Sequence, residues 1–111
     1  MLKHNWTFDE DYVCCSAYLH YIYGEKENQN VNYLIYNLTL KLPNLSKGSI
    51  RMKLQNIKQI CMKYNIVGDH MDIAPLSNYS EQCVIAFTKA FKDYVAELEK
   101  KLNKPIIEGG V

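Results

Sequence analysis

The chain has 111 residues, a formal net charge of +1 and 48% hydrophobic residues, which predict one globular domain rather than a disordered chain. It has no run of the roughly 20 apolar residues that a membrane-spanning helix needs. Its first residues are polar and acidic (Asp9, Glu10 and Asp11), so we recognise no signal peptide. We therefore expect a cytoplasmic protein without a membrane segment, whose four cysteines are reduced, buried thiols.

The first predicted helix begins with a capping box. The Thr7 hydroxyl can accept a hydrogen bond from the Glu10 amide, and the Glu10 carboxylate can accept one from the Thr7 amide. Apolar residues then recur at helical spacing, namely Phe8, Tyr12, Cys15, Leu19 and Ile22. This pattern predicts a helix from about Phe8 to Tyr23 that ends at Gly24.

Residues 31–41 again carry apolar side chains three and four positions apart, which predicts a second helix. Because Asn, Tyr and Thr lower its helix propensity, a strand is the alternative for this segment. Pro43 ends the segment.

Ser46 then has the position of an N-cap for a third helix, with Leu45 and Ile50 spaced as a hydrophobic staple.

The third predicted helix runs from Lys47 to about Asn65, and its apolar stripe consists of Ile50, Leu54, Ile57, Cys61 and Tyr64. Residues 66–78 contain Gly68 and Pro75 and predict a loop, with a short hairpin as the alternative. Ser80 can cap a last helix over about Ser80–Leu102, before Pro105. The apolar stripe of this last helix consists of Val84, Phe87, Phe91, Leu98 and Leu102, with either Tyr94 or Val95 between Phe91 and Leu98.

Together these elements predict an all-α fold. We expect a single helical domain over residues 1–105, with a three-helix, helix-turn-helix-like core at 6–65, a long C-terminal helix at 80–102 and a tail at 106–111. The residues expected to be largely buried are Trp6, Phe8, Tyr12, Leu19, Leu38, Ile50, Leu54, Ile57, Phe87 and Phe91. A last helix of roughly 30 Å exceeds what such a core covers, so we also expect a homodimer through it.

Positive charge is concentrated in one block of the sequence. Residues 28–68 contain no Asp or Glu, although the chain's average of 12 acids in 111 residues would place about four there. The same block carries Lys41, Lys47, Arg51, Lys53, Lys58 and Lys63. A basic region of this kind is typical of a surface that binds a polyanion.

The third predicted helix offers side chains suited to reading duplex DNA. Arg and Lys can donate to guanine O6 and N7, Gln can pair with adenine, and Lys or Ser can hold phosphates. The candidates are Arg51 and Lys58 for guanine, Gln55 and Gln59 for adenine, Lys47 and Ser49 for phosphates, and Lys53 and Lys63 as further basic contacts. The alternative interpretation is a solvated helix face, because Lys, Arg and Gln are good helix formers.

Two resemblances support a DNA-binding interpretation. The opening Trp6-Thr7-Phe8-Asp9-Glu10-Asp11, with the two helices and turn that follow, resembles the start of a Myb/SANT-type three-helix unit. The string Leu-Pro-Asn-Leu-Ser-Lys-Gly-Ser-Ile-Arg-Met-Lys-Leu-Gln-Asn-Ile at 42–57 is similar to N-terminal modules of some bacterial HNH-type and modification-dependent restriction endonucleases. The resemblance spans about residues 6–65, without the nuclease half, and implies DNA recognition through the third helix.

Other classes of function have less support in the sequence. It has no glycine-rich phosphate loop, no GxSxG and no paired-cysteine motif, so we expect neither catalysis nor a cofactor or bound metal. The tyrosines at 12, 18, 21, 23, 33 and 36 could stack on bases, but their helical spacing favours a role in the core. The competing class is a small intracellular protein-interaction module, for example an inhibitor or accessory of a DNA-defence enzyme.

Overall fold

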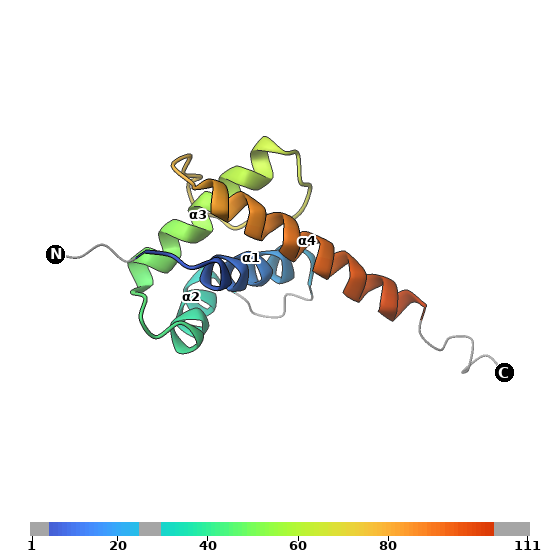
Figure 1. Cartoon of the computed structure of the whole chain (residues 1–111), viewed down its shortest axis with the longest axis horizontal. Coiled ribbons are helices and arrows are strands. Elements are labelled where there is room, and N and C mark those ends of the chain that lie inside the picture. Colours follow the sequence, from blue (N-terminus) through green and yellow to red (C-terminus); the bar gives the residue numbers. More distant parts are fainter. Residues whose placement is uncertain (1–4, 25–29, 104–111) are drawn as a thin grey trace.

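The computed structural model describes residues 5–24 and 30–103, which form four helices (Figure 1). These are α1 (Phe8–Tyr23), α2 (Val31–Lys41), α3 (Lys47–Lys63) and α4 (Glu81–Leu102). The described ranges contain no strand, so the all-α prediction is confirmed and both the strand at 31–41 and the hairpin at 66–78 are excluded. The predicted tail at 106–111 lies outside the described residues.

Side-chain caps fix where the helices begin. Thr7 and Glu10 form the predicted capping box, with N···O distances of 3.1 and 2.9 Å. Ser46 and Ser80 accept hydrogen bonds from the third amide of α3 and of α4, as predicted. Asn30 caps α2 in the same way, a role that the sequence analysis missed. Caps of this type each stabilise a helix by about 1 kcal/mol.

The end of α3 turns the chain back toward the domain. Asn65 has a φ of 56°, the left-handed conformation that Asn tolerates better than most residues. Its amide donates to the Met62 carbonyl at 3.3 Å, and the Ile66 amide donates to the Cys61 carbonyl at 2.8 Å. These two bonds are the Schellman motif, and they end α3 at Lys63 rather than at Asn65.

Helices α1 and α4 lie side by side and run in the same direction, while α3 crosses them and α2 packs against α3 (Figure 1). The direction follows from contacts at both ends of the pair. Near the helix starts, Gln82 bonds Asp11, and farther along, the rings of Tyr23 and Tyr94 lie 5.8 Å apart. The core between the helices contains all four cysteines, which are buried free thiols as expected.

The predicted core is only partly right. Leu19, Leu38, Ile50, Leu54, Ile57 and Phe87 are buried, as expected. Trp6, Phe8, Tyr12 and Phe91 are only partly buried and pack against the edge of the core. For Tyr12 the reason is its hydroxyl, which bonds Asp93 at the surface between α1 and α4. Met71 and Ile73, from the segment predicted as a loop, fill core positions instead.

None of the helices that the structure describes is both long and apolar enough to cross a membrane.

Candidate nucleic-acid interface

Lys53, one of the proposed DNA contacts, lies inside the protein. Its Nζ is 2.8 Å from Asp11 Oδ1, and the two side chains are 8% and 0% exposed. The same Nζ lies 4.5 Å from the centre of the Trp6 ring. The prediction for Lys53 is therefore wrong in placement, because α1 supplies a buried carboxylate that holds this lysine away from solvent.

Lys58 is also engaged within the molecule. Its Nζ donates to the Met71 and Ile73 carbonyls, both at 2.8 Å. These carbonyls belong to residues 66–79, which we call the return segment because they lead from the end of α3 back to the start of α4. Lys58 is thus a structural anchor for the return segment, with two of the three donors of its ammonium group used internally.

The return segment crosses the middle of α3. The Leu76 amide donates to the Gln55 carbonyl at 3.1 Å, and the Asn56 side chain donates to the Leu76 carbonyl at 2.8 Å. Gln55 and Gln59 are partly buried at this level, whereas Arg51, one turn earlier, is exposed. The return segment therefore lies beside Gln55, and both glutamines are less exposed than Arg51.

The remaining candidates fall at the two ends of α3. Lys47 and Arg51 are exposed and lie one helical turn apart in the first half of the helix. Ser49 is partly buried, and its Oγ accepts a hydrogen bond from the Ser46 hydroxyl at 3.1 Å. Lys63 is exposed but lies 12 residues beyond Arg51, about 18 Å along the helix. The structure therefore brings Lys47 and Arg51 together and leaves Lys63 apart.

Exposed tyrosines of α2 lie beside this pair. Tyr33 and Tyr36 are 58% and 49% exposed and occupy adjacent turns of α2. Lys47 Nζ lies 6.0 Å from the centre of the Tyr36 ring, so α2 and the start of α3 present a common surface. The helical spacing of the tyrosines predicts a core role for these rings, with base stacking as the alternative, and the core role is wrong for Tyr33 and Tyr36.

A shallow groove of about 220 Å³ separates α2 from the start of α3, and it is lined by Asn32, Ile35, Lys47, Gly48 and Arg51. At Gly48 an added Cβ would meet only the Ser46 Oγ, at 3.9 Å, so the backbone here is open to an approaching ligand. We call the surface formed by Asn32, Tyr33, Tyr36, Lys47, Gly48 and Arg51 the α2–α3 face.

The α2–α3 face combines the groups that bind a nucleic-acid strand. Cations supply attraction to phosphates, exposed aromatic rings can stack on bases, and the capped start of α3 adds the positive end of its helix dipole. The segments that build the face, residues 30–51, contain no Asp or Glu. The geometry therefore retains a basic, aromatic surface, smaller than the one predicted and shifted toward α2.

No protein-family model matches this chain, and no curated protein or solved structure is significantly similar to it. Within the described ranges, no group of three His, Cys, Asp or Glu side chains is arranged to hold a metal ion.

Proposed function

We propose that this protein is a non-catalytic DNA-binding module that contacts duplex DNA through the α2–α3 face. The observation that carries the proposal is the exposed pair Lys47 and Arg51, on the uncovered half of α3 and next to Tyr36. In helix-turn-helix proteins the N-terminal residues of the recognition helix contact the base edges, while the preceding helix crosses the backbone. The exposed half of α3 is the half that this docking mode uses.

Individual roles follow from chemistry. Arg51 has the planar fork of donors that recognises guanine O6 and N7, and Lys47 is a point charge suited to a phosphate. Tyr33 and Tyr36 would stack on bases if the preferred ligand were single-stranded. The block of residues 28–68, which has no Asp or Glu, supports a polyanion as the ligand.

Fluorescence anisotropy with labelled random duplex and single-stranded DNA, at low and high salt, tests this function. We expect binding that weakens moderately as salt is raised, because the face brings only two cations, Lys47 and Arg51, to the DNA and the slope scales with the number of phosphates neutralised. Replacing Lys47 and Arg51 together by Ala should reduce affinity at least tenfold. The matched control replaces Lys100 and Lys101, which are exposed at the end of α4, and should leave affinity nearly unchanged.

Equal losses in the two double variants would show that any positive charge suffices and would contradict the assigned face. Absence of binding to both DNA forms at low salt would overturn the proposal and favour the protein-interaction class. Stronger binding to single-stranded DNA would support the α2–α3 face as the binding surface but contradict duplex DNA as its ligand. Stacking of bases on Tyr33 and Tyr36 would then explain the binding.

A further inference from the structure

The last two turns of α4 extend beyond the rest of the domain (Figure 1). Tyr94, at 8% exposure, is the last buried residue of the helix, and every residue from 95 to 102 is exposed. Three of these residues are large and apolar: Val95 and Leu98 are each 40% exposed, and Leu102 is 76% exposed. Adjacent apolar side chains that stay exposed to this degree mark a surface suited to contact with another molecule.

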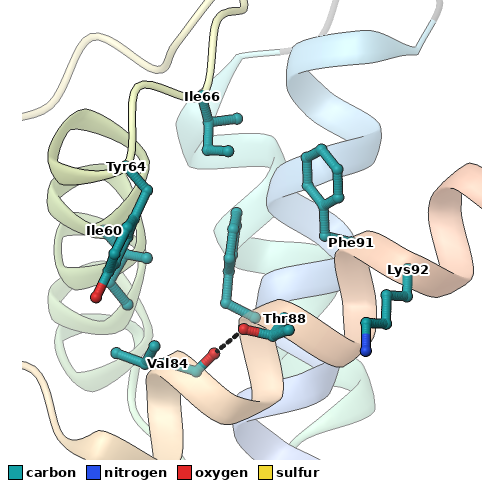
Figure 2. Close-up of a pocket in the computed structure, with 8 residues that line it drawn as sticks. Ile60, Tyr64, Ile66, Val84, Thr88, Phe91 and Lys92 are labelled. Carbon is teal, nitrogen blue, oxygen red and sulfur yellow. Dashed lines mark hydrogen bonds between the residues drawn. The ribbon is translucent and has the colours of Figure 1, made fainter.

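The three exposed apolar residues form one stripe with the partly buried Phe91. Phe91, Val95, Leu98 and Leu102 are spaced by four, three and four residues, which is the spacing of a coiled-coil seam. We call these four residues the α4 seam. Toward the start of the helix the seam continues into an open apolar groove of about 420 Å³ between α3 and α4 (Figure 2). Ile60, Tyr64 and Ile66 form the opposite wall of that groove.

The charges beside the seam indicate what covers it. Lys92 and Glu99 directly follow Phe91 and Leu98, so both flank the same side of the seam, two turns apart. Neither has an ion-pair partner among the described residues. If two copies of α4 pack antiparallel, Lys92 of each copy lies beside Glu99 of the other. In a parallel pair these residues would remain about 10 Å apart along the axis.

We propose that a second copy of this chain covers the α4 seam, with the two α4 ends packed antiparallel. Val95 then packs beside Leu98 of the second copy, and Phe91 beside Leu102 of the second copy. The overlap runs from Phe91 to Leu102 of each copy, so the two domains lie at opposite ends of the pair. This pairing is independent of nucleic-acid binding.

The seam is short, and an interface of about three helical turns per copy is at the small end of specific interfaces. We therefore expect a weak dimer that forms as concentration rises, not an obligate one. Sedimentation velocity from micromolar to several hundred micromolar should show a mass that rises from one chain toward two. A single-chain mass over this whole range would overturn the proposal.

Two variants of neighbouring residues test whether the two copies meet through the α4 seam. Val95→Asp places a charge in the seam and should abolish the rise in mass. Ala96→Asp adds the same group to an exposed position off the seam and should keep the rise. Circular dichroism should show that both variants stay helical. A dimer that survives Val95→Asp, or that is lost equally in both variants, would place the contact elsewhere.

Charge reversal tests whether the two α4 helices pack antiparallel. Lys92→Glu alone and Glu99→Lys alone should each weaken association severalfold, because each places like charges together in the antiparallel pair. The double variant Lys92→Glu with Glu99→Lys exchanges the partners and should restore association. A double variant as weak as the singles, or singles without effect, would contradict the antiparallel arrangement.

Discussion

Lys53 and Asp11 form an ion pair inside the protein, with 2.8 Å between Nζ and Oδ1. Gln82 donates to the other carboxylate oxygen of Asp11 at 2.8 Å and to the Trp6 carbonyl at 2.9 Å. One carboxylate thus joins α1, α3 and α4 where all three meet. The pair also explains why a lysine of the basic block does not reach the surface.

Removing one partner of this pair should be strongly destabilising. Lys53→Met leaves Asp11 charged, buried and unpaired, which costs about 3–5 kcal/mol of the free energy of unfolding. Arg51→Met, two residues earlier on the exposed side of α3, should change stability by less than about 0.5 kcal/mol. Urea unfolding followed by circular dichroism measures both. Similar stabilities for the two variants would show that the ion pair does not hold the helices together.

Lys58→Met tests the role of the return segment. The change removes the donor of two carbonyl groups, Met71 and Ile73, and should cost about 1–3 kcal/mol. In the folded variant, DNA affinity should match that of the unchanged protein, because Lys58 is used internally. Urea unfolding and anisotropy on the same sample separate the effects. A clear loss of affinity without a loss of stability would return Lys58 to the DNA-binding surface.

The turn after α3 makes Asn65 a position with opposite responses to two small residues. Asn65→Gly should stabilise the protein or leave it unchanged, because glycine has no Cβ to strain at a φ of 56°. Asn65→Ala should destabilise it by about 1 kcal/mol, because alanine is strained in the left-handed region. Thermal unfolding of the two variants shows which of them is the more stable. Equal stabilities would mean that the turn relaxes freely when Asn65 is replaced.

The bond between Tyr12 and Asp93 predicts how stability depends on pH. The hydrogen bond to Asp93 and, next, burial raise the pKa of Tyr12 from 10.0 to about 12. The folded state then holds this proton more tightly than the unfolded chain does, so the stabilisation is complete below pH 10 and is lost as the pH rises toward 12. The same bond, with Lys89, lowers the pKa of Asp93, so its contribution is present at neutral pH and is lost in acid below its ordinary pKa.

Tyr12→Phe should therefore flatten the fall of the melting temperature between pH 9 and 12, compared with the unchanged protein. Tyr33→Phe is the control, because Tyr33 is exposed on α2. An equally steep fall in Tyr12→Phe would show that other groups cause the alkaline loss.

Local signals in the sequence predicted the helices well. Thr7, Ser46 and Ser80 are caps in the structure as they were in the analysis, because a capping side chain and its amide lie three residues apart in the chain. Burial was harder to predict, because it depends on which segments meet. Lys58 lies outside the apolar stripe of α3, and Lys53 lies at its edge, three residues after Ile50 and four before Ile57. Neither position shows that Asp11 and the return segment engage these lysines.

The return segment contained one usable signal. Met71 and Ile73 are alternating apolar residues within a polar loop, a pattern typical of a segment that packs against a core. For Tyr33 and Tyr36 the sequence contains no such signal, because their spacing fits a buried helix face as well as an exposed one. Whether such rings face the core is decided by how α2 rotates against α3, which no local pattern encodes.

The central claim, that the α2–α3 face binds DNA, is tested most directly by Gly48→Glu. The position is open, so a glutamate fits there. It should also stabilise α3, since glycine is a poor helix former and a negative charge suits a helix N-terminus. On the face itself, the carboxylate would stand between Lys47 and Arg51 and repel phosphate. We predict an unchanged or higher melting temperature together with a loss of DNA affinity of at least tenfold, measured by anisotropy at low salt. Full DNA affinity in the stably folded Gly48→Glu variant would contradict the account.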